Sequence, residues 1–279
     1  MPVNIASRSG RASRLLRSLD PLSLAGILLL IILWHCLSLI VSPSLLSSPT
    51  TAVAALADGF FEAKGFAYYG LEDVGFFSAL SYTLQNVALA TTFGSAFGIL
   101  AGLLSARSGT IRSLLDPVVF TLGTTPIIVA SPFLLIWVGG ERASAVTMVC
   151  FYVFVTLYIY TLRAVTNIDP VYESFGMSVG AHPGLITRSI LLPAIVPEIL
   201  GGIRIAFASS WGLECLAELL GSQRGLGKLI ESITNASDTD NLFAALLLLG
   251  LAALFCDRLL TFVIRLATPW NNAGQRIGF

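Results

Sequence analysis

Runs of apolar residues long enough to cross a lipid bilayer recur along this chain, and they limit its fold more than any other feature. The hydrocarbon core of a bilayer is about 30 Å thick, so a helix of about 20 apolar residues spans it. Lipid offers backbone polar groups no partner, which makes a helix the simplest structure for each run. The sequence therefore predicts an all-α membrane protein with six transmembrane helices, at about 22–42, 79–105, 118–138, 143–163, 194–220 and 241–265.

The composition agrees with a chain that mainly faces lipid. Hydrophobic residues make up 55% of it and charged residues 11%, whereas about a quarter of the residues of a soluble domain are charged. The formal net charge is zero, so nothing attracts nucleic acid. The four cysteines lie in apolar runs, and the two histidines, His35 and His182, are far apart in sequence. We therefore expect no disulfide framework, no metal site and no cofactor bound by this chain.

The first and third runs each raise an alternative. Four arginines precede the first run, as they would in a signal peptide, but the apolar part of such peptides is only about 7–15 residues long. We therefore expect a retained transmembrane helix at 22–42. Pro126 and Pro132 interrupt the third run, which predicts a kinked helix packed inside a bundle.

Lysines and arginines near the ends of the runs predict the orientation, because cytoplasmic loops are enriched in them. With the N-terminus inside, ten of these residues fall on the inner side and four on the outer side. The tails 1–21 and 267–279 are then cytoplasmic, and 43–77 is a periplasmic loop. This loop carries apolar residues at helical spacing, which fits an interfacial helix or a helix packed on the bundle equally well. They are Val53, Leu56, Phe60 and Phe61.

The inner segment 166–193 breaks the apolar pattern with the stretch ESFGMSVGAHPGLITRSILLP. Asp169-Pro170 predicts a helix start, and Gly180 predicts a left-handed turn that ends this helix. A second short helix follows, and we expect Leu192-Pro193 to turn the chain back into the membrane. The segment would expose a small apolar surface, which indicates either a docking site or a loop helix lying on the membrane. Its members are Phe175, Met177, Val179 and Ala181.

The same segment resembles the signature loop of the permease subunits of bacterial ABC importers. That signature has a Glu, a Gly seven residues later and a Leu-Pro pair twelve residues after the Gly. Further similarity, at 114–119, 121–141 and 199–230, is to the branch that imports nitrate, sulfonates, taurine, bicarbonate or thiamine-precursor pyrimidines. The signature residues here are Glu173, Gly180, Leu192 and Pro193.

This resemblance implies a type I ABC importer permease subunit, not an enzyme, with a permease core at 78–266. The loop would be a coupling helix that docks on a separate ATPase, which binds the ATP and Mg. Partners implied are two ATPase copies, a periplasmic or lipid-anchored solute-binding protein and a second permease, in the bacterial cytoplasmic (inner) membrane. The second permease would be another copy of this chain, which we favour because we find no second permease half in the sequence, or a paralogue. The family often has two alanines where this chain has Ser174 and Phe175. The implied docking residues are Glu173, Phe175, Met177, Gly180, Ala181, Leu192 and Pro193.

Two further sets of residues stand out within the apolar runs. Small residues spaced by four let helices approach closely, and Gly94, Gly98 and Gly102 have this spacing. Charged residues at membrane depth face a cavity or a partner. Four residues of the fifth run could therefore line a solute path or pair within the bundle: Arg204, Trp211, Glu214 and Glu218.

Two other functions remain as alternatives to the importer subunit. A self-sufficient secondary transporter would show repeated halves with broken helices, and only the proline-interrupted third run supports it. A membrane enzyme would need a catalytic cluster, and the pair Glu214 and Glu218 is a weak candidate. The sequence does not identify the transported solute.

Overall fold

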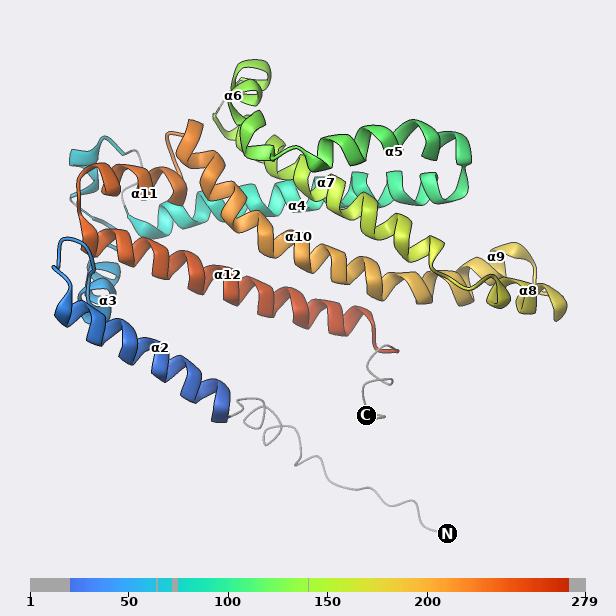
Figure 1. Ribbon diagram of the computed structural model, residues 1–279, viewed down its shortest axis with the longest axis horizontal. Coiled ribbons are helices and arrows are strands. Elements are labelled where there is room, and N and C mark those ends of the chain that lie inside the picture. The colour runs from blue at the N-terminus through green and yellow to red at the C-terminus, as the bar shows by residue number, and fades with distance from the viewer. Residues whose placement is uncertain (1–20, 64, 72–74, 140, 271–279) are drawn as a thin grey trace, which may run out of the picture.

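The computed structural model describes residues 21–63, 65–71, 75–139 and 141–270 (Figure 1). Most of both expected tails, 1–20 and 271–279, lies outside the described residues. Every regular element in the described ranges is a helix. The elements are α2 (Pro21–Ile40), α3 (Pro49–Asp58), η2 (Phe66–Tyr69), α4 (Phe76–Arg107), α5 (Gly109–Thr124), α6 (Ile127–Val138), α7 (Glu141–Thr166), α8 (Pro170–Ser178), α9 (Pro183–Ile186), η3 (Thr187–Leu191), α10 (Leu192–Gly221), α11 (Leu226–Asn235) and α12 (Thr239–Ala267).

Four helical segments of the described chain are long and apolar enough to cross a membrane. They are α4, α7, the continuous stretch from α9 through α10, and α12. The helices α4 and α7 pack most extensively, and α10 packs on both of them. Figure 1 shows these helices running side by side, with α11 at one end and α8 and α9 at the other. The bent pair α5 and α6 brings the number of possible spans to five, and the apolar part of α2, Leu24–Ile40, is shorter.

Glycines on one face of α4 explain how closely α4 and α7 approach. A Cβ atom added at Gly94 would lie 2.6 Å from the carbonyl oxygen of Cys150. One added at Gly98 would lie 2.6 Å from the carbonyl oxygen of Phe154, and Gly102 is crowded in the same way. These distances are far below van der Waals contact. The backbones of the two helices therefore meet where a side chain on α4 would separate them.

The third expected span, 118–138, differs in the structure. The helix begins nine residues earlier, at Gly109, directly after α4, and it is split into α5 and α6 with a bend of 105° between them. The break falls at Thr125, whose ψ of 127° is extended, because Pro126 disfavours the helical conformation for the residue before it. Pro132, by contrast, lies inside α6 without breaking it.

The segment between α2 and α4 packs on the end of α12. The helix α3 contacts α12, and the Ser47 hydroxyl donates to Asp240 Oδ1 at 2.6 Å. The indole of Trp34 on α2 donates to the Ser47 carbonyl at 2.9 Å and stacks near Phe243 with ring centroids 5.8 Å apart. These contacts attach α2 and α3 to the rest of the chain at the α11 end.

Candidate functional site

The segment between α7 and α10 forms a compact helical hairpin, α8 and α9, which projects beyond the long helices (Figure 1). Asp169 Oδ1 accepts a hydrogen bond from the Val171 amide at 2.9 Å, and Pro170 occupies the first turn of α8. Gly180 has φ of +81°, a left-handed conformation that glycine adopts without strain. The helix start and the turn are therefore formed by the residues from which they were predicted.

Two residues that sequence reasoning did not single out hold the hairpin together. Gly176 is buried, and a Cβ atom there would lie 2.9 Å from Ile186 Cγ1, so α9 packs directly on the backbone of α8. His182 Nδ1 accepts from the Leu185 amide at 3.2 Å and so caps α9. Two features of the sequence could have indicated these residues: the Gly-x-x-x-Gly spacing of Gly176 and Gly180, and the His-Pro pair.

The expectation that Leu192-Pro193 turns the chain back is wrong. The chain reverses at Gly180, and from Pro183 to Gly221 it forms one continuous helical stretch of 39 residues. Just before the proline, the Leu192 amide donates to the Thr187 carbonyl, five residues earlier, in a π-helical turn. Such a widened turn relieves the clash that a proline ring makes inside a regular helix.

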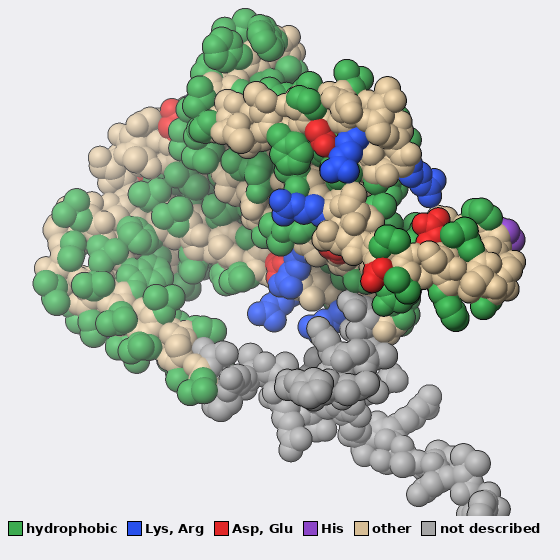
Figure 2. Space-filling view, turned by 45° about the vertical axis from the view of Figure 1, so that its right-hand side comes forward, with side chains coloured by type: hydrophobic (Ala, Val, Ile, Leu, Met, Phe, Trp, Pro, Cys, Tyr) green, Lys and Arg blue, Asp and Glu red, His purple; other side chains and the backbone are tan. Residues whose placement is uncertain are grey.

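The hairpin presents large apolar side chains to its surroundings. Phe175 is 65% exposed, Met177 55% and Val179 67%. The lobe at the right of Figure 2 shows hydrophobic side chains on its surface, beside a few acidic ones. Of the other expected docking residues, Glu173 and Leu192 are exposed, and Ala181 and Pro193 are half-buried.

The four polar or aromatic candidates of α10 do not share one environment. Arg204 makes a bidentate ion pair with Asp257 of α12: Nε donates to Oδ1 at 2.7 Å and Nη2 donates to Oδ2 at 2.8 Å. The other three, Trp211, Glu214 and Glu218, are buried inside the chain. The seven-residue spacing therefore did not predict a common surface, because α10 has different neighbours along its length.

Glu218 ties three elements together. Its carboxylate accepts from the Thr83 hydroxyl of α4, at 2.8 and 2.9 Å, and from the Gly227 amide at 2.9 Å. The same hydroxyl accepts from the Leu226 amide at 2.9 Å. A carboxylate at the first turn of α11 also suits the positive end of the helix dipole. Glu218 and Thr83 thus secure α11, which follows a turn at Gly225 with φ of +97°, onto α10 and α4.

Glu214 has the same burial but different surroundings. The Asn86 amide and the Arg142 guanidinium are the polar groups that act on its carboxyl group. Arg142 Nε donates to Asn86 Oδ1 at 2.8 Å, its Nη2 donates to Gln85 Oε1 at 3.1 Å, and the guanidinium lies 5.3 Å from the ring centroid of Tyr82. The exposed Arg142 is therefore hydrogen-bonded to a buried amide that lies beside a fully buried acid.

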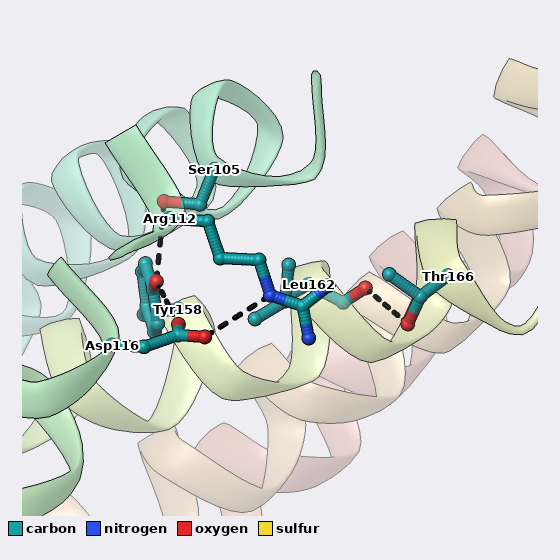
Figure 3. Close-up of polar contacts among 6 residues, drawn as sticks. All are labelled: Ser105, Arg112, Asp116, Tyr158, Leu162 and Thr166. Carbon is teal, nitrogen blue, oxygen red and sulfur yellow. Dashed lines mark hydrogen bonds and ion pairs between the residues drawn. The ribbon is translucent and has the colours of Figure 1, made fainter. Parts of the chain in front are cut away.

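A second polar cluster, which sequence reasoning missed, fixes α5 beside α4 and α7 (Figure 3). The buried Tyr158 hydroxyl of α7 donates to Asp116 Oδ1 of α5 and lies 3.1 Å from Ser105 Oγ of α4. Arg112 Nε donates to Asp116 Oδ2 at 3.0 Å. In the sequence, the one indication of this cluster was Asp116, an aspartate inside an apolar run.

Within the described ranges, no three His, Cys, Asp or Glu side chains lie close enough to hold a metal ion. The polar clusters of the described chain instead connect helices to one another. The arrangement is one of packed apolar helices with a projecting hairpin.

Proteins that are similar to this chain in sequence are permease proteins of transport systems. The E. coli taurine transport system permease protein TauC is 28% identical over 74% of this chain and 75% of its own length. The nitrate import permease protein NrtB of Synechococcus elongatus is 26% identical over 85% of this chain and 86% of its own length. The formylaminopyrimidine transport permease protein ThiX of Halalkalibacterium halodurans is 23% identical over 88% of this chain and 94% of its own length.

Solved structures show the same fold. The MetNI methionine ABC transporter, in an inward-facing form, matches with a TM-score of 0.60 at 17% identity, over 73% of this chain and 98% of the matched chain. A bacterial ABC transporter that imports alginate also gives 0.60 at 17% identity, over 90% and 98%. The family model described as "Binding-protein-dependent transport system inner membrane component" matches residues 74–271. The chain belongs to this family and is a permease subunit of an ABC importer.

Proposed function

We propose that this permease subunit is driven by a separate ATPase that docks on the α8–α9 hairpin. The observation that carries the proposal is the exposed apolar surface of Phe175, Met177 and Val179, on a hairpin that projects beyond the membrane-spanning helices. An apolar surface that is covered neither by the protein nor by lipid favours a protein partner. The hairpin would lie on the cytoplasmic side, with six spans and both termini inside, in a bacterial cytoplasmic membrane.

The internal packing of the hairpin suits this role. Because Gly176 brings α9 against α8, and α9 continues into α10, a force on the hairpin reaches the membrane helices directly. A loosely tethered loop would absorb the same force. Two ATPase copies closing on ATP would thus pull two hairpins together and reorient the helices of two permease copies.

The solute path would lie between two copies of the chain, along the surface that carries Arg204 and Asp257. This pair lies well inside the spanning stretches of α10 and α12, and its arginine side chain is 49% exposed. Charges at that depth face water or protein instead of lipid. Trp211, Glu214 and Glu218 would then support the path through packing.

A cavity at the break between α5 and α6 is a second element of the proposed path. Its volume is 480 Å³, and its lining includes Thr125, Tyr152 and Tyr160. The relatives transport taurine, nitrate and formylaminopyrimidine, and a cavity of this size accommodates a small solute of that kind. We propose a small polar solute, delivered from outside by a solute-binding protein.

Charge substitutions on the hairpin test the docking. We expect Phe175→Glu and Met177→Glu to abolish both co-purification of an ABC ATPase from native membranes and the associated ATP hydrolysis. Ser178→Ala is the control on the same helix, because Ser178 is also exposed on α8 and its hydroxyl donates to the Phe175 carbonyl. Retention of the ATPase by both charged variants would overturn the proposal. Solute transport by the chain without any ATPase would favour the secondary-transporter alternative.

A further inference from the structure

Two buried acids one turn apart on α10 differ in their hydrogen bonding. Glu214 and Glu218 are both 0% exposed. Glu218 accepts hydrogen bonds from Thr83 and from Gly227. Neither carboxyl oxygen of Glu214 has a hydrogen-bond partner among the described residues. A buried carboxyl group without a partner is costly in either protonation state, and by far the more so when ionised.

Two unpartnered donors lie beside this acid. Asn86 is fully buried and its Oδ1 accepts from Arg142, so its Nδ2 is the atom that faces the Glu214 carboxyl group, without making a hydrogen bond to it or to another described residue. Trp211 is 3% exposed, and its Nε1 is likewise without an acceptor. Because residues three apart on a helix share a face, Trp211 and Glu214 are neighbours on α10.

The chemistry of these orphaned atoms points to one ligand. The atoms without a partner are two donor nitrogens, Asn86 Nδ2 and Trp211 Nε1, and the two oxygens of Glu214. Protonation of Glu214 would add a third donor and would give neither nitrogen an acceptor. A water molecule accepts two hydrogen bonds and donates two, so it can satisfy Asn86 Nδ2, Trp211 Nε1 and both oxygens of Glu214. A buried water has three such partners on average.

We propose that Asn86, Glu214 and Trp211 form an internal water-binding site between α4 and α10. The exposed Arg142 is hydrogen-bonded to Asn86, so this site lies one side chain away from the protein surface. The site is independent of the ATPase docking proposed above, since it involves neither α8 nor α9.

Radiolytic footprinting tests the site on the full-length permease in lipid nanodiscs. A short X-ray pulse generates hydroxyl radicals from water, including bound internal water, and mass spectrometry locates the oxidised side chains. Met148 is the internal control: it is 1% exposed, it lies in an apolar cluster with Ala145 and Ala217, and methionine is itself easily oxidised. We expect Trp211 to be oxidised several-fold faster than Met148 despite equal burial.

Two variants then test whether the oxidation of Trp211 depends on the polar side chains of Glu214 and Asn86. Glu214→Leu and, separately, Asn86→Leu should lower the oxidation rate of Trp211 several-fold and leave that of Met148 unchanged. The second variant keeps the test valid if the first does not fold. The proposal is overturned if Trp211 is oxidised no faster than Met148 in the wild type, or if its rate is unchanged in a folded variant.

Discussion

Thr83→Val is the sharpest test of how α11 is held. Valine has nearly the shape of threonine, so the substitution removes the hydroxyl group and little else. That hydroxyl donates to Glu218 and accepts from the Leu226 amide, and all three residues are fully buried. Each buried polar group left without a partner costs about 1–3 kcal/mol. Glu218 keeps its bond from the Gly227 amide, but the Leu226 amide is left without a partner, so we expect attachment of α11 to weaken by about 1–3 kcal/mol.

Trypsin cleavage at the exposed Arg224, in the turn before α11, measures this loss. When opening is fast relative to cleavage, the rate follows the population of the open form, and a loss of about 2 kcal/mol already raises that population roughly 30-fold. Thr92→Val is the matched control on α4, because Thr92 is exposed and its hydroxyl only donates to the Ala88 carbonyl. We expect that control to change stability by less than about 0.5 kcal/mol.

Thr83→Ser, which keeps the hydroxyl group, should be cleaved close to the wild-type rate. The reasoning fails if Thr83→Val is cleaved no faster than Thr92→Val. It also fails if Thr83→Ser is as sensitive as Thr83→Val, because lost packing would then explain the effect.

Three further substitutions test other contacts by thermal unfolding of the purified permease. Gly94→Ala should destabilise it by about 1–3 kcal/mol through overpacking against α7, whereas Gly250→Ala, with open space around its Cβ position, should not. Tyr158→Phe removes the buried donor to Asp116 and should cost about 1–3 kcal/mol; an unchanged midpoint would contradict the role of that cluster. Arg204→Asp should be destabilising alone and rescued by Asp257→Arg, and a lack of rescue would show that the ion pair of α10 and α12 is not what Arg204 contributes.

The sequence predicted those parts of the fold that depend on local pattern. Hydropathy located the long helices, and Asp169-Pro170 and Gly180 predicted the ends of α8 because capping and left-handed turns are properties of a few adjacent residues. Leu192-Pro193 was misread for the opposite reason. A proline within a helix can be accommodated by a π-turn five residues long. The residue types in that turn do not predict it from the sequence.

The candidate site was predictable only where its partners are close in sequence. Glu218 was recognised as an acid at membrane depth that could line a path or pair within the bundle, but its partner Thr83 lies 135 residues away, and no spacing rule connects the two. In the same way, Arg204 was grouped with Trp211 by their spacing of seven, although its partner, Asp257, lies on another helix. Which face of a helix meets which neighbour is decided by tertiary packing, which one sequence does not reveal.

The continuous helical stretch Pro183–Gly221 also has the geometry of a lever. At 1.5 Å per residue its 39 residues make a rod of about 58 Å. The bonds from Glu218 to α4 and α11 clamp one end, because hydrogen bonds tolerate only tenths of an ångström of extension. A rotation of the whole stretch would therefore be centred near Glu218. A tilt of about 5° around it would carry the α9 end through about 5 Å, a large stroke for a small rotation.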